Sequence, residues 1–317
     1  TPFGVYLTSP DYLGGMQDIA ALSAVCDAHG VPLLVDNAHG AYLRFLPGGS
    51  RHPIDLGAAA CCDSGHKTLP VLTGGAYLHL GPKAPVQEES TVRSALALFG
   101  STSPSYLILQ SLDACNRLLS TDYPARLQEC CDRLAALRAR LNTLAAAQGT
   151  ALPLALDGPA REPMKLTLDA AALGLTGQAL ADYLRQNGME CEYADPRYLV
   201  LMFTPENPAE DFARLEAALA ELCARGIPPA EPPAEHREAF CALVRQAEPR
   251  LTVRQAVFAP QEQVPTEQAV GRICAMPTVS CPPAIPIVVS GEKITPAAVR
   301  LMQKYHVMQA AVLRKTI

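Results

Sequence analysis

Apolar and polar residues follow one another in short blocks along the first part of the chain. Residues 5–9 (VYLTS) are typical of a buried strand, and residues 16–30 carry apolar side chains at helical spacing before a glycine. Residues 31–36 (VPLLVD) then form an apolar run that ends on Asp36. A strand, a helix and a strand joined by short links predict a parallel sheet. Ligands of such sheets bind at the carboxyl ends of strands, where Asp36 is expected to lie.

The pattern continues to the end of the chain. We expect short strands at residues 58–64 and 74–81, and a long helical stretch over 104–149 that is broken near residues 122–124. Two further strands alternate with two helices between residues 163 and 226, and a linker rich in Pro and Glu follows. The chain is therefore predicted to hold part of a large α/β domain (1–150), a small α/β domain (151–226), the linker (227–235) and a C-terminal domain (236–317).

Composition excludes several classes of function. The 317 residues include 26 basic and 31 acidic ones, so no basic surface for nucleic acid is expected. No apolar run reaches the roughly 20 residues that a membrane helix needs. The eleven cysteines are odd in number and contain no CxxC spacing. This pattern favours reduced thiols in the cytoplasm, and we expect no metal site.

The segment 61–70 (CCDSGHKTLP) places Lys67 among small and polar residues. Most lysines are simply solvated, which is the plain alternative. The flanking Ser64, His66 and Thr68, however, are suited to phosphate contact, and the apolar turn that follows could shield the amine from water. A lysine partly withdrawn from water has a lowered pKa and becomes a nucleophile for carbonyl compounds.

Asp36 opens a second segment, DNAHG. An acid at a strand end often only caps the next turn. Here it is followed by Ala38, which is small enough to lie against a flat ring, and by His39. A carboxylate in this position could keep the nitrogen of a pyridine ring protonated.

Both segments, and three others, resemble one family: the bacterial ornithine/lysine/arginine decarboxylases, which are pyridoxal 5′-phosphate (PLP) enzymes of the aspartate-aminotransferase fold, also called fold type I. The resemblance covers nearly the whole chain and is carried by VDNAHGAYLRF (35–45), SGHKTLPVLTGGAYLHL (64–80), GSTSPSYLILQSLD (100–113), PMKLTLDAAALGLTG (163–177) and AVGRICAMPTVSCPPAIPIVVSGEKIT (269–295). It implies an α/β fold: a partial fold-type-I large domain, a small α/β domain and the α+β C-terminal domain of that family.

The resemblance also implies roles around the cofactor ring. Lys67 would be the catalytic amine that condenses with the aldehyde of PLP. Asp36 would pair with the ring nitrogen, and Ala38 would pack on the ring. His39 would lie beside the cofactor and its substrate, where it or Lys67 could return a proton to Cα.

Further roles concern the phosphate and the substrate. Ser64 and His66 would bind the phosphate, and Ser101 or Thr102 would reach the phosphate of a neighbouring subunit, because sites of this fold lie at a dimer interface. Glu292 would face the distal cation of the substrate through a charge-assisted contact. A homodimer or larger homo-oligomer is therefore expected.

Two departures from the family pattern limit these expectations. Cys281, Ala284 and Ser290 stand where the family has Tyr, Gly and Pro, and Met276 stands where an acid is common, so the substrate stays open. The family also has a segment that would precede Thr1 and supply further cofactor contacts. We therefore expect this chain alone to bind PLP weakly or not at all.

The expected function is PLP-dependent decarboxylation of arginine, lysine or ornithine to CO2 and an amine of the polyamine pathway. Two alternatives remain open at this point. One is another fold-type-I enzyme, an aminotransferase or a desulfurase, in which an arginine of the small domain binds the substrate carboxylate; Arg197 is the candidate. The other is a non-catalytic paralogue that assembles with a true decarboxylase, although such a role would not require Lys67 and Asp36.

Overall fold

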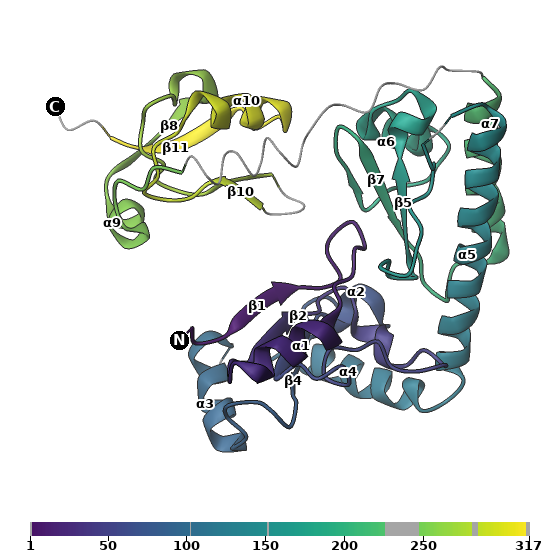
Figure 1. The fold of residues 1–317 in the computed structure, drawn as a ribbon, viewed down its shortest axis with the longest axis horizontal. Helices are drawn as coiled ribbons and strands as arrows, with labels where there is room; N and C mark the ends of the chain where they lie inside the picture. Colours follow the sequence, from purple (N-terminus) through teal and green to yellow (C-terminus); the bar gives the residue numbers. More distant parts are fainter. Residues whose placement is uncertain (1, 102, 151, 226–246, 281–284, 315–317) are drawn as a thin grey trace. The chain divides into compact units, whose positions relative to one another are not determined.

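The structure is a computed structural model that describes residues 2–101, 103–150, 152–225, 247–280 and 285–314 (Figure 1). The chain divides into two compact units. The first comprises Thr1–Asp169, Asn187–Glu192 and Val200–Ile227, and the second comprises Ala170–Gln186, Tyr193–Leu199 and Pro228–Ile317. The domain boundaries expected from the sequence stay predictions. Among the described helices, none has the length and apolar character needed to cross a membrane.

The first unit contains a four-stranded sheet in the order β1 (Val5–Thr8), β2 (Leu33–Asp36), β3 (Ala60–Asp63) and β4 (Tyr77–Leu80). The first three strands are parallel, as the sequence predicts, and β4 pairs with β3 in the antiparallel direction. Leu33 and Val35 of β2 are buried, which explains the apolar run of that strand.

The connection between β1 and β2 is helix α1 (Ile19–Ala28), which Figure 1 shows beside the sheet. Its N-cap residue Asp18 accepts a hydrogen bond from the backbone N–H of Ala21 at 3.0 Å, which satisfies one of the open donors of the first turn. Ile19 and Cys26 pack with the buried residues of the strands. The predicted strand–helix–strand unit is confirmed.

A short 3-10 helix, η1 (Ala41–Arg44), follows β2, and the helices α2 (Gly65–Thr68), α3 (Glu89–Phe99), α4 (Tyr106–Leu119) and α5 (Tyr123–Ala147) come later in the chain. The break expected near residues 122–124 falls between α4 and α5. The long helix α5 buries nine side chains, whereas α3 buries none. One core of the unit therefore lies under α5, where Leu127 and Cys131 meet Tyr42 and Leu43.

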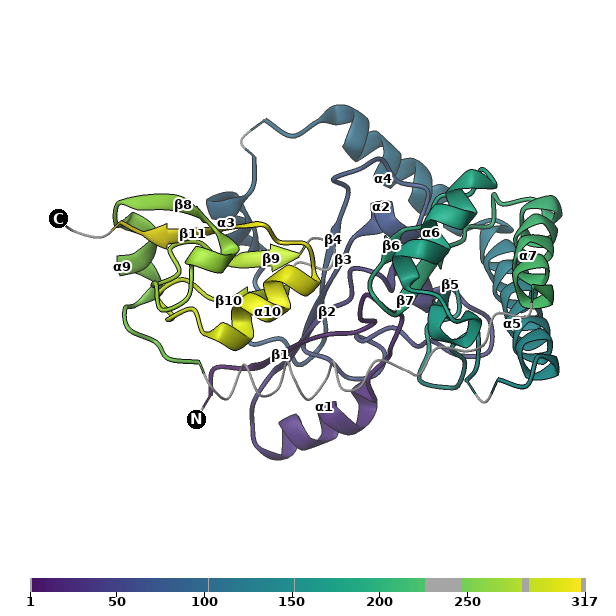
Figure 2. The same ribbon diagram turned by 90° about the horizontal axis from the view of Figure 1, so that it is seen from above.

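A second sheet has the order β5 (Lys165–Asp169), β7 (Tyr198–Met202) and β6 (Tyr193–Ala194). Helix α6 (Gly177–Gln186) precedes β6, after the 3-10 helix η2 (Ala170–Leu173), and helix α7 (Ala209–Ala224) follows β7. Figures 1 and 2 both show α7 alongside α5. Arg140 of α5 pairs with Glu216 of α7 at 2.8 Å, and Arg126 pairs with Glu206 at 2.9 Å.

The C-terminal part of the second unit is an α+β arrangement, as expected. Strands β8 (Gln261–Pro265) and β11 (Gln309–Leu313) form one antiparallel pair, and β9 (Thr278–Ser280) and β10 (Ile285–Val288) form another. The remaining elements are α9 (Val253–Phe258), η3 (Thr266–Gln268) and α10 (Pro296–Lys304). Its core contains Cys274, Ile294, Met302 and Val312, each with a fully or almost fully buried side chain.

Candidate active site

Asp36 is the last residue of β2, and its side chain is held by the start of the following loop. Its Oδ1 atom accepts the backbone N–H of Ala38 at 3.1 Å, and its Oδ2 atom accepts the hydroxyl of Tyr6 at 3.3 Å. Asp36 and Ala38 are both half-buried. The carboxylate is therefore oriented by the backbone, while the side chain stays partly accessible at the carboxyl edge of the sheet.

Lys67 lies in α2, directly after β3. The N-cap of this one-turn helix is Ser64, whose carbonyl accepts the backbone N–H of Lys67 at 3.0 Å. Nδ1 of His66 lies 3.0 Å from the carbonyl oxygen of Gly75, which fixes the imidazole against the next loop. Ser64, His66 and Lys67 are all half-buried. Because β2 and β3 are parallel neighbours, α2 starts at the same edge of the sheet as the loop that follows Asp36.

His39 and Lys67 are brought together. Nζ of Lys67 lies 3.3 Å from Nε2 of His39. His39 is only 4% exposed, and its ring meets the ring of Tyr12 edge to face, with centroids 5.1 Å apart. Burial, together with the nearby cations of Lys165 and Lys67, lowers the pKa of His39 to about 3. The imidazole is therefore neutral at physiological pH, and Nε2 can accept a hydrogen bond from the amine.

Lys165, the first residue of β5, is a second lysine at this site and, unlike Lys67, is buried; the sequence reasoning missed it. It is 4% exposed, and its Nζ donates to the carbonyl oxygens of Asp11 and Tyr12, both at 3.1 Å. Burial lowers the pKa of Lys165 to about 8, although the carboxylate of Glu162 opposes that shift. The available signal was the alternation in KLTLD, which places Lys165, Thr167 and Asp169 on one face of the strand and two leucines on the other.

Glu162 supplies a buried carboxyl group beside Lys165. Its Oε2 atom accepts hydrogen bonds from the hydroxyl of Tyr42 and, at 3.1 Å, from the backbone N–H of Met164. Burial raises the pKa of Glu162, and burial together with Glu162 raises that of Tyr42 well above its ordinary value. These groups link η1 to the start of β5 through polar contacts inside the core.

The remaining predicted residues belong to other parts of the chain. Ser101 is exposed just after α3, and Thr102 lies outside the described residues. Glu292 belongs to the second unit, where its Oε2 atom accepts the backbone N–H of Val289 at 2.9 Å. Arg197, the arginine that the alternative enzyme classes would use, also belongs to that unit, and its guanidinium lies over the ring of Tyr198 at 5.0 Å.

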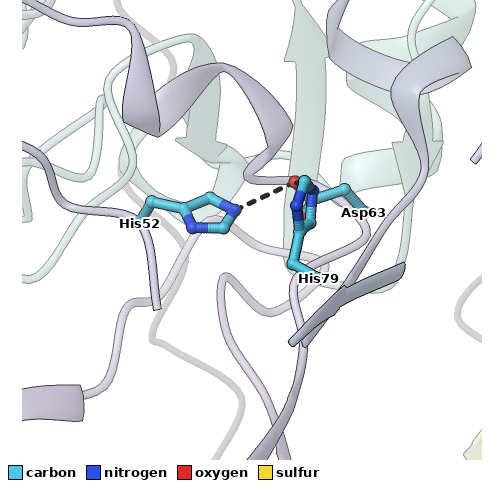
Figure 3. Close-up of side chains that lie close together, drawn as sticks. All are labelled: His52, Asp63 and His79. Carbon is cyan, nitrogen blue, oxygen red and sulfur yellow. Dashed lines mark hydrogen bonds and ion pairs between the residues drawn. The ribbon is translucent and has the colours of Figure 1, made fainter. Parts of the chain in front are cut away.

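A separate group of polar side chains gathers at the end of β3. Asp63 is buried, and its Oδ2 atom lies 3.0 Å from Nε2 of His52 and 3.0 Å from Nε2 of His79 (Figure 3). Its Oδ1 atom accepts the side-chain N–H of Asn37 at 2.7 Å. Two imidazoles and a carboxylate with converging atoms could hold a metal ion. This cluster, like Lys165, was not expected from the sequence.

Comparison with known proteins covers most of the chain. Residues 3–160 match the model of the Orn/Lys/Arg decarboxylase major domain, and residues 234–315 match that of the C-terminal domain of the same family. Over 295 residues the chain is 30% identical to the arginine decarboxylase of Bacillus subtilis strain 168. The aligned residues cover 92% of this chain and 59% of that protein. The chain thus spans about three-fifths of the length of that relative.

Solved structures show the same fold. The lysine decarboxylase of Francisella novicida superposes with a TM-score of 0.73 at 16% identity, over 99% of this chain and 57% of that one. The ureidoglycine–glyoxylate aminotransferase of Bacillus subtilis superposes with a TM-score of 0.53 at 17% identity, over 73% of this chain and 63% of that one. The fold is therefore that of fold-type-I PLP enzymes. Both parts of the family pattern are present, and the chain belongs to the Orn/Lys/Arg decarboxylase family.

Proposed function

We propose that this chain carries the reactive centre of a PLP-dependent decarboxylase that acts on a basic amino acid and releases CO2 and an amine of the polyamine pathway. The observation that carries the proposal is the 3.3 Å contact between the amine of Lys67 and the buried, neutral imidazole of His39. Family membership supplies the reaction class, since the matched family models are named for decarboxylases of ornithine, lysine and arginine.

PLP is the cofactor of this family, and the residues of the first unit fit it. Lys67 supplies the amine, and Asp36 supplies a carboxylate whose orientation is fixed by the N–H of Ala38. Among the described residues, the Nδ1 atom of His39 is buried and has no hydrogen-bond partner, although the imidazole lies beside the reactive amine. A buried polar atom without a partner is costly, so a bound group that engages His39 would remove that penalty.

When bound, PLP withdraws electrons from Cα of an amino acid, so that the carboxylate can leave as CO2. The side chains of this chain have distinct tasks in that chemistry. Lys67 would hold the cofactor through its amine. Asp36 would keep the ring nitrogen protonated, and Ala38 would leave room for the ring. His39, being neutral and 3.3 Å from Nζ, can accept a hydrogen bond from the amine of Lys67 and so orient it.

The substrate is proposed to be arginine, lysine or ornithine. Arginine is the first to test, because the B. subtilis relative is named an arginine decarboxylase. Glu292 is the candidate partner of the distal cation, and the bond from the N–H of Val289 fixes one of its carboxylate oxygens. Ser64 and His66 remain the proposed phosphate contacts from the start of α2.

A second copy of the chain is the proposed partner. Helix α3, just before Ser101, has no buried residue, and Leu98 and Phe99 are 79% and 93% exposed. Apolar side chains this exposed are typical of a surface that a partner covers. This arrangement fits a subunit interface at which Ser101 or Thr102 reaches the neighbouring phosphate. We propose the cytoplasm as the compartment, because none of the nine cysteines that the structure describes forms a disulfide.

Covalent trapping tests the proposal directly. The chain is incubated with excess PLP, reduced with borohydride so that even a weak adduct becomes permanent, and digested for mass spectrometry. We expect the pyridoxyl group on Lys67. Lys165→Met, which removes the other buried lysine but keeps Lys67, is the matched control and should keep the label. A label on Lys165, or an equal label on exposed lysines, would contradict the assignment.

The reaction class is tested with the same preparation. Release of CO2 and of the amine is measured from arginine, lysine and ornithine, and keto-acid formation is measured in parallel. Decarboxylation of one of the three that disappears in Lys67→Ala supports the proposal. Keto acid without CO2 would indicate an aminotransferase, and trapping without any product would show that the chain binds the cofactor but lacks groups that the reaction needs.

A further inference from the structure

We propose that His52, Asp63 and His79 form a binding site for a divalent transition-metal ion, with zinc as the preferred ion. The site does not depend on the decarboxylase proposal, since none of the three side chains is assigned to the cofactor or the substrate. The geometry rests on three converging atoms. Nε2 of His52 and Nε2 of His79 each lie 3.0 Å from Oδ2 of Asp63, and all three lie within 4.8 Å of one another.

The pairing of β3 with β4 places these groups on one face. Cys61 and Asp63 are two residues apart on β3, so their side chains point the same way. Cys61 lies directly opposite His79 in the antiparallel register, and Asp63 lies opposite Tyr77. His52 comes from the loop between η1 and β3, and its ring meets that of His79 at 83° with centroids 5.1 Å apart. Figure 3 shows the three labelled side chains converging from these segments.

The ligand set suits zinc. Two imidazoles and one carboxylate are a common three-residue set for a zinc ion that keeps an open position. With bonds of about 2.0–2.1 Å, ligand atoms of a tetrahedral site lie about 3.4 Å apart, so the observed 3.0 Å spacings need to widen by only a few tenths of an ångström. The Sγ atom of Cys61 lies 3.7 Å from Nε2 of His52 and 3.8 Å from Oδ1 of Asp63, within reach of a fourth position.

The surroundings supply support and access. The bond from Asn37 to Oδ1 of Asp63 orients the carboxylate so that Oδ2 faces the two imidazoles. Such outer contacts commonly fix the ligands of metal sites. His79 has one-third of its side chain exposed, and all three residues line a pocket that is open to solvent. An ion can therefore enter from this side.

The competing arrangement is a hydrogen-bond network in which both imidazoles donate a proton to Asp63. The Nδ1 atom of His52 bears on this choice, because it is buried and has no partner among the described residues. Metal binding through Nε2 would move the ring proton to Nδ1, where no described group accepts it. We therefore expect binding weaker than that of a fully supported structural zinc site, and the test must measure affinity as well as stoichiometry.

A bound ion would also stabilise the segment from Asp63 to α2, which carries Lys67. Asp63 is the last residue of β3 and is followed at once by Ser64, the N-cap of α2. A ligand that binds only the folded protein stabilises it by mass action. The ion should therefore raise the melting temperature of the chain whether or not PLP is bound.

The experiment uses the whole chain after removal of metals with a chelator. Zn²⁺ binding is measured by calorimetry and by elemental analysis after dialysis, and Co²⁺ is added as a spectroscopic probe of coordination. We expect one equivalent of Zn²⁺, a higher melting temperature, and Co²⁺ bands of a four- or five-coordinate site. His79→Ala, whose side chain is partly exposed and whose loss should leave the fold intact, should weaken Zn²⁺ binding at least tenfold and remove the bands.

The matched control is His29→Ala, since His29 is an exposed histidine at the end of α1, and it should behave as the unaltered chain. Cys61→Ser tests the fourth position: loss of a sulfur-to-metal charge-transfer band would assign Sγ as a ligand, whereas an unchanged spectrum would leave a three-residue site with solvent. If the unaltered chain takes up no metal, or if His79→Ala and the unaltered chain bind Zn²⁺ equally, the cluster is a hydrogen-bond network and the proposal is overturned.

Discussion

The two histidine clusters of the first unit differ in how their charges are balanced. In the first, His39 lies beside Lys67 and near Lys165, so a buried imidazole faces cations. In the second, His52 and His79 share the carboxylate of Asp63. The first arrangement disfavours the positively charged forms of His39 and Lys165. Burial and the neighbouring cations lower the pKa of His39 to about 3, and burial lowers that of Lys165 to about 8. The second favours the charged form of Asp63, because burial raises the pKa of that carboxyl but the hydrogen bonds from the two imidazoles outweigh this and hold it below its usual range. Shifted pKa values of the first kind are typical of reacting groups, and satisfied pairs are typical of structural or ligand sites.

The largest effect is expected at the first cluster. Lys67→Ala removes the amine that holds the cofactor, and Lys165, the other lysine near His39, donates its Nζ to the carbonyl oxygens of Asp11 and Tyr12 instead. We expect pyridoxyl labelling at this position to vanish and decarboxylation to fall below detection. Lys67→Arg keeps the positive charge but cannot form the same bond, so it should fail equally. If either variant kept activity within tenfold of the unaltered chain, the reactive lysine would lie elsewhere.

The second cluster should show its main effect on stability. Asp63→Ala removes the shared acceptor of His52, His79 and Asn37, and leaves the buried His52 without its partner. Loss of one partner of a buried pair destabilises a protein by about 3–5 kcal/mol. We expect a loss of that size in urea unfolding at pH 7. A loss below about 1 kcal/mol, in the range of exposed pairs, would show that the cluster is solvated.

The same carboxylate predicts an acid response. Burial raises the pKa of Asp63, but the hydrogen bonds from His52 and His79 outweigh this and hold that pKa below its usual range. A depressed pKa contributes stability that is full above the unfolded value of about 3.9 and is lost as the pH falls below it. The unaltered chain should therefore lose stability more steeply than Asp63→Ala below about pH 4, as acid unfolding curves of the two proteins would show.

The contrast also explains what the sequence could predict. Lys67 and His39 each stand in a compact local motif, SGHKT and DNAHG, at the end of a predicted strand, so the parallel order of β2 and β3 suffices to bring them to one edge. The strands, the long helices and the break before α5 follow from apolar periodicity for the same local reason. The placements found here for Ser101 and Glu292 do not test their expected roles, and these stay predictions.

The missed residues are those whose partners come from distant segments. The amine of Lys165 donates to the backbone carbonyls of Asp11 and Tyr12, more than 150 residues earlier in the chain. Every residue has a backbone carbonyl, so the sequence does not indicate which ones accept such a bond. His79 falls within the predicted strand 74–81, and nothing in the sequence marks its partner. Its partner Asp63 became visible only through the antiparallel register of β3 and β4, because a shift of one residue would have turned the side chain to the other face.

A smaller effect should separate Lys165 from ordinary lysines. A lysine whose pKa falls from 10.5 to about 8 on folding opposes folding below pH 8, and that penalty disappears as the pH rises toward 10.5. Stability should therefore rise with pH in this window by about 2–3 kcal/mol relative to Lys165→Met, which cannot titrate. Urea unfolding of both proteins at several pH values between 7 and 10.5 gives the difference. A difference that is flat across this window would mean that Lys165 is not buried as a titrating group.

The smallest effect sharpens the comparison within the second cluster. His52 and His79 make the same 3.0 Å contact with the same oxygen of Asp63, but their side chains are 1% and 33% exposed. Water can replace the bond lost in His79→Ala, so we expect a loss below about 1 kcal/mol in chelator at pH 7. His52→Ala, which also opens a cavity, should cost several times more. Equal losses for the two variants would show that the shared carboxylate, rather than burial of the imidazole, decides the energy of each contact. This unfolding measurement is made without metal. If His79→Ala loses less than about 1 kcal/mol of stability there, its fold is intact, and weaker Zn²⁺ binding by this variant then reports a lost ligand.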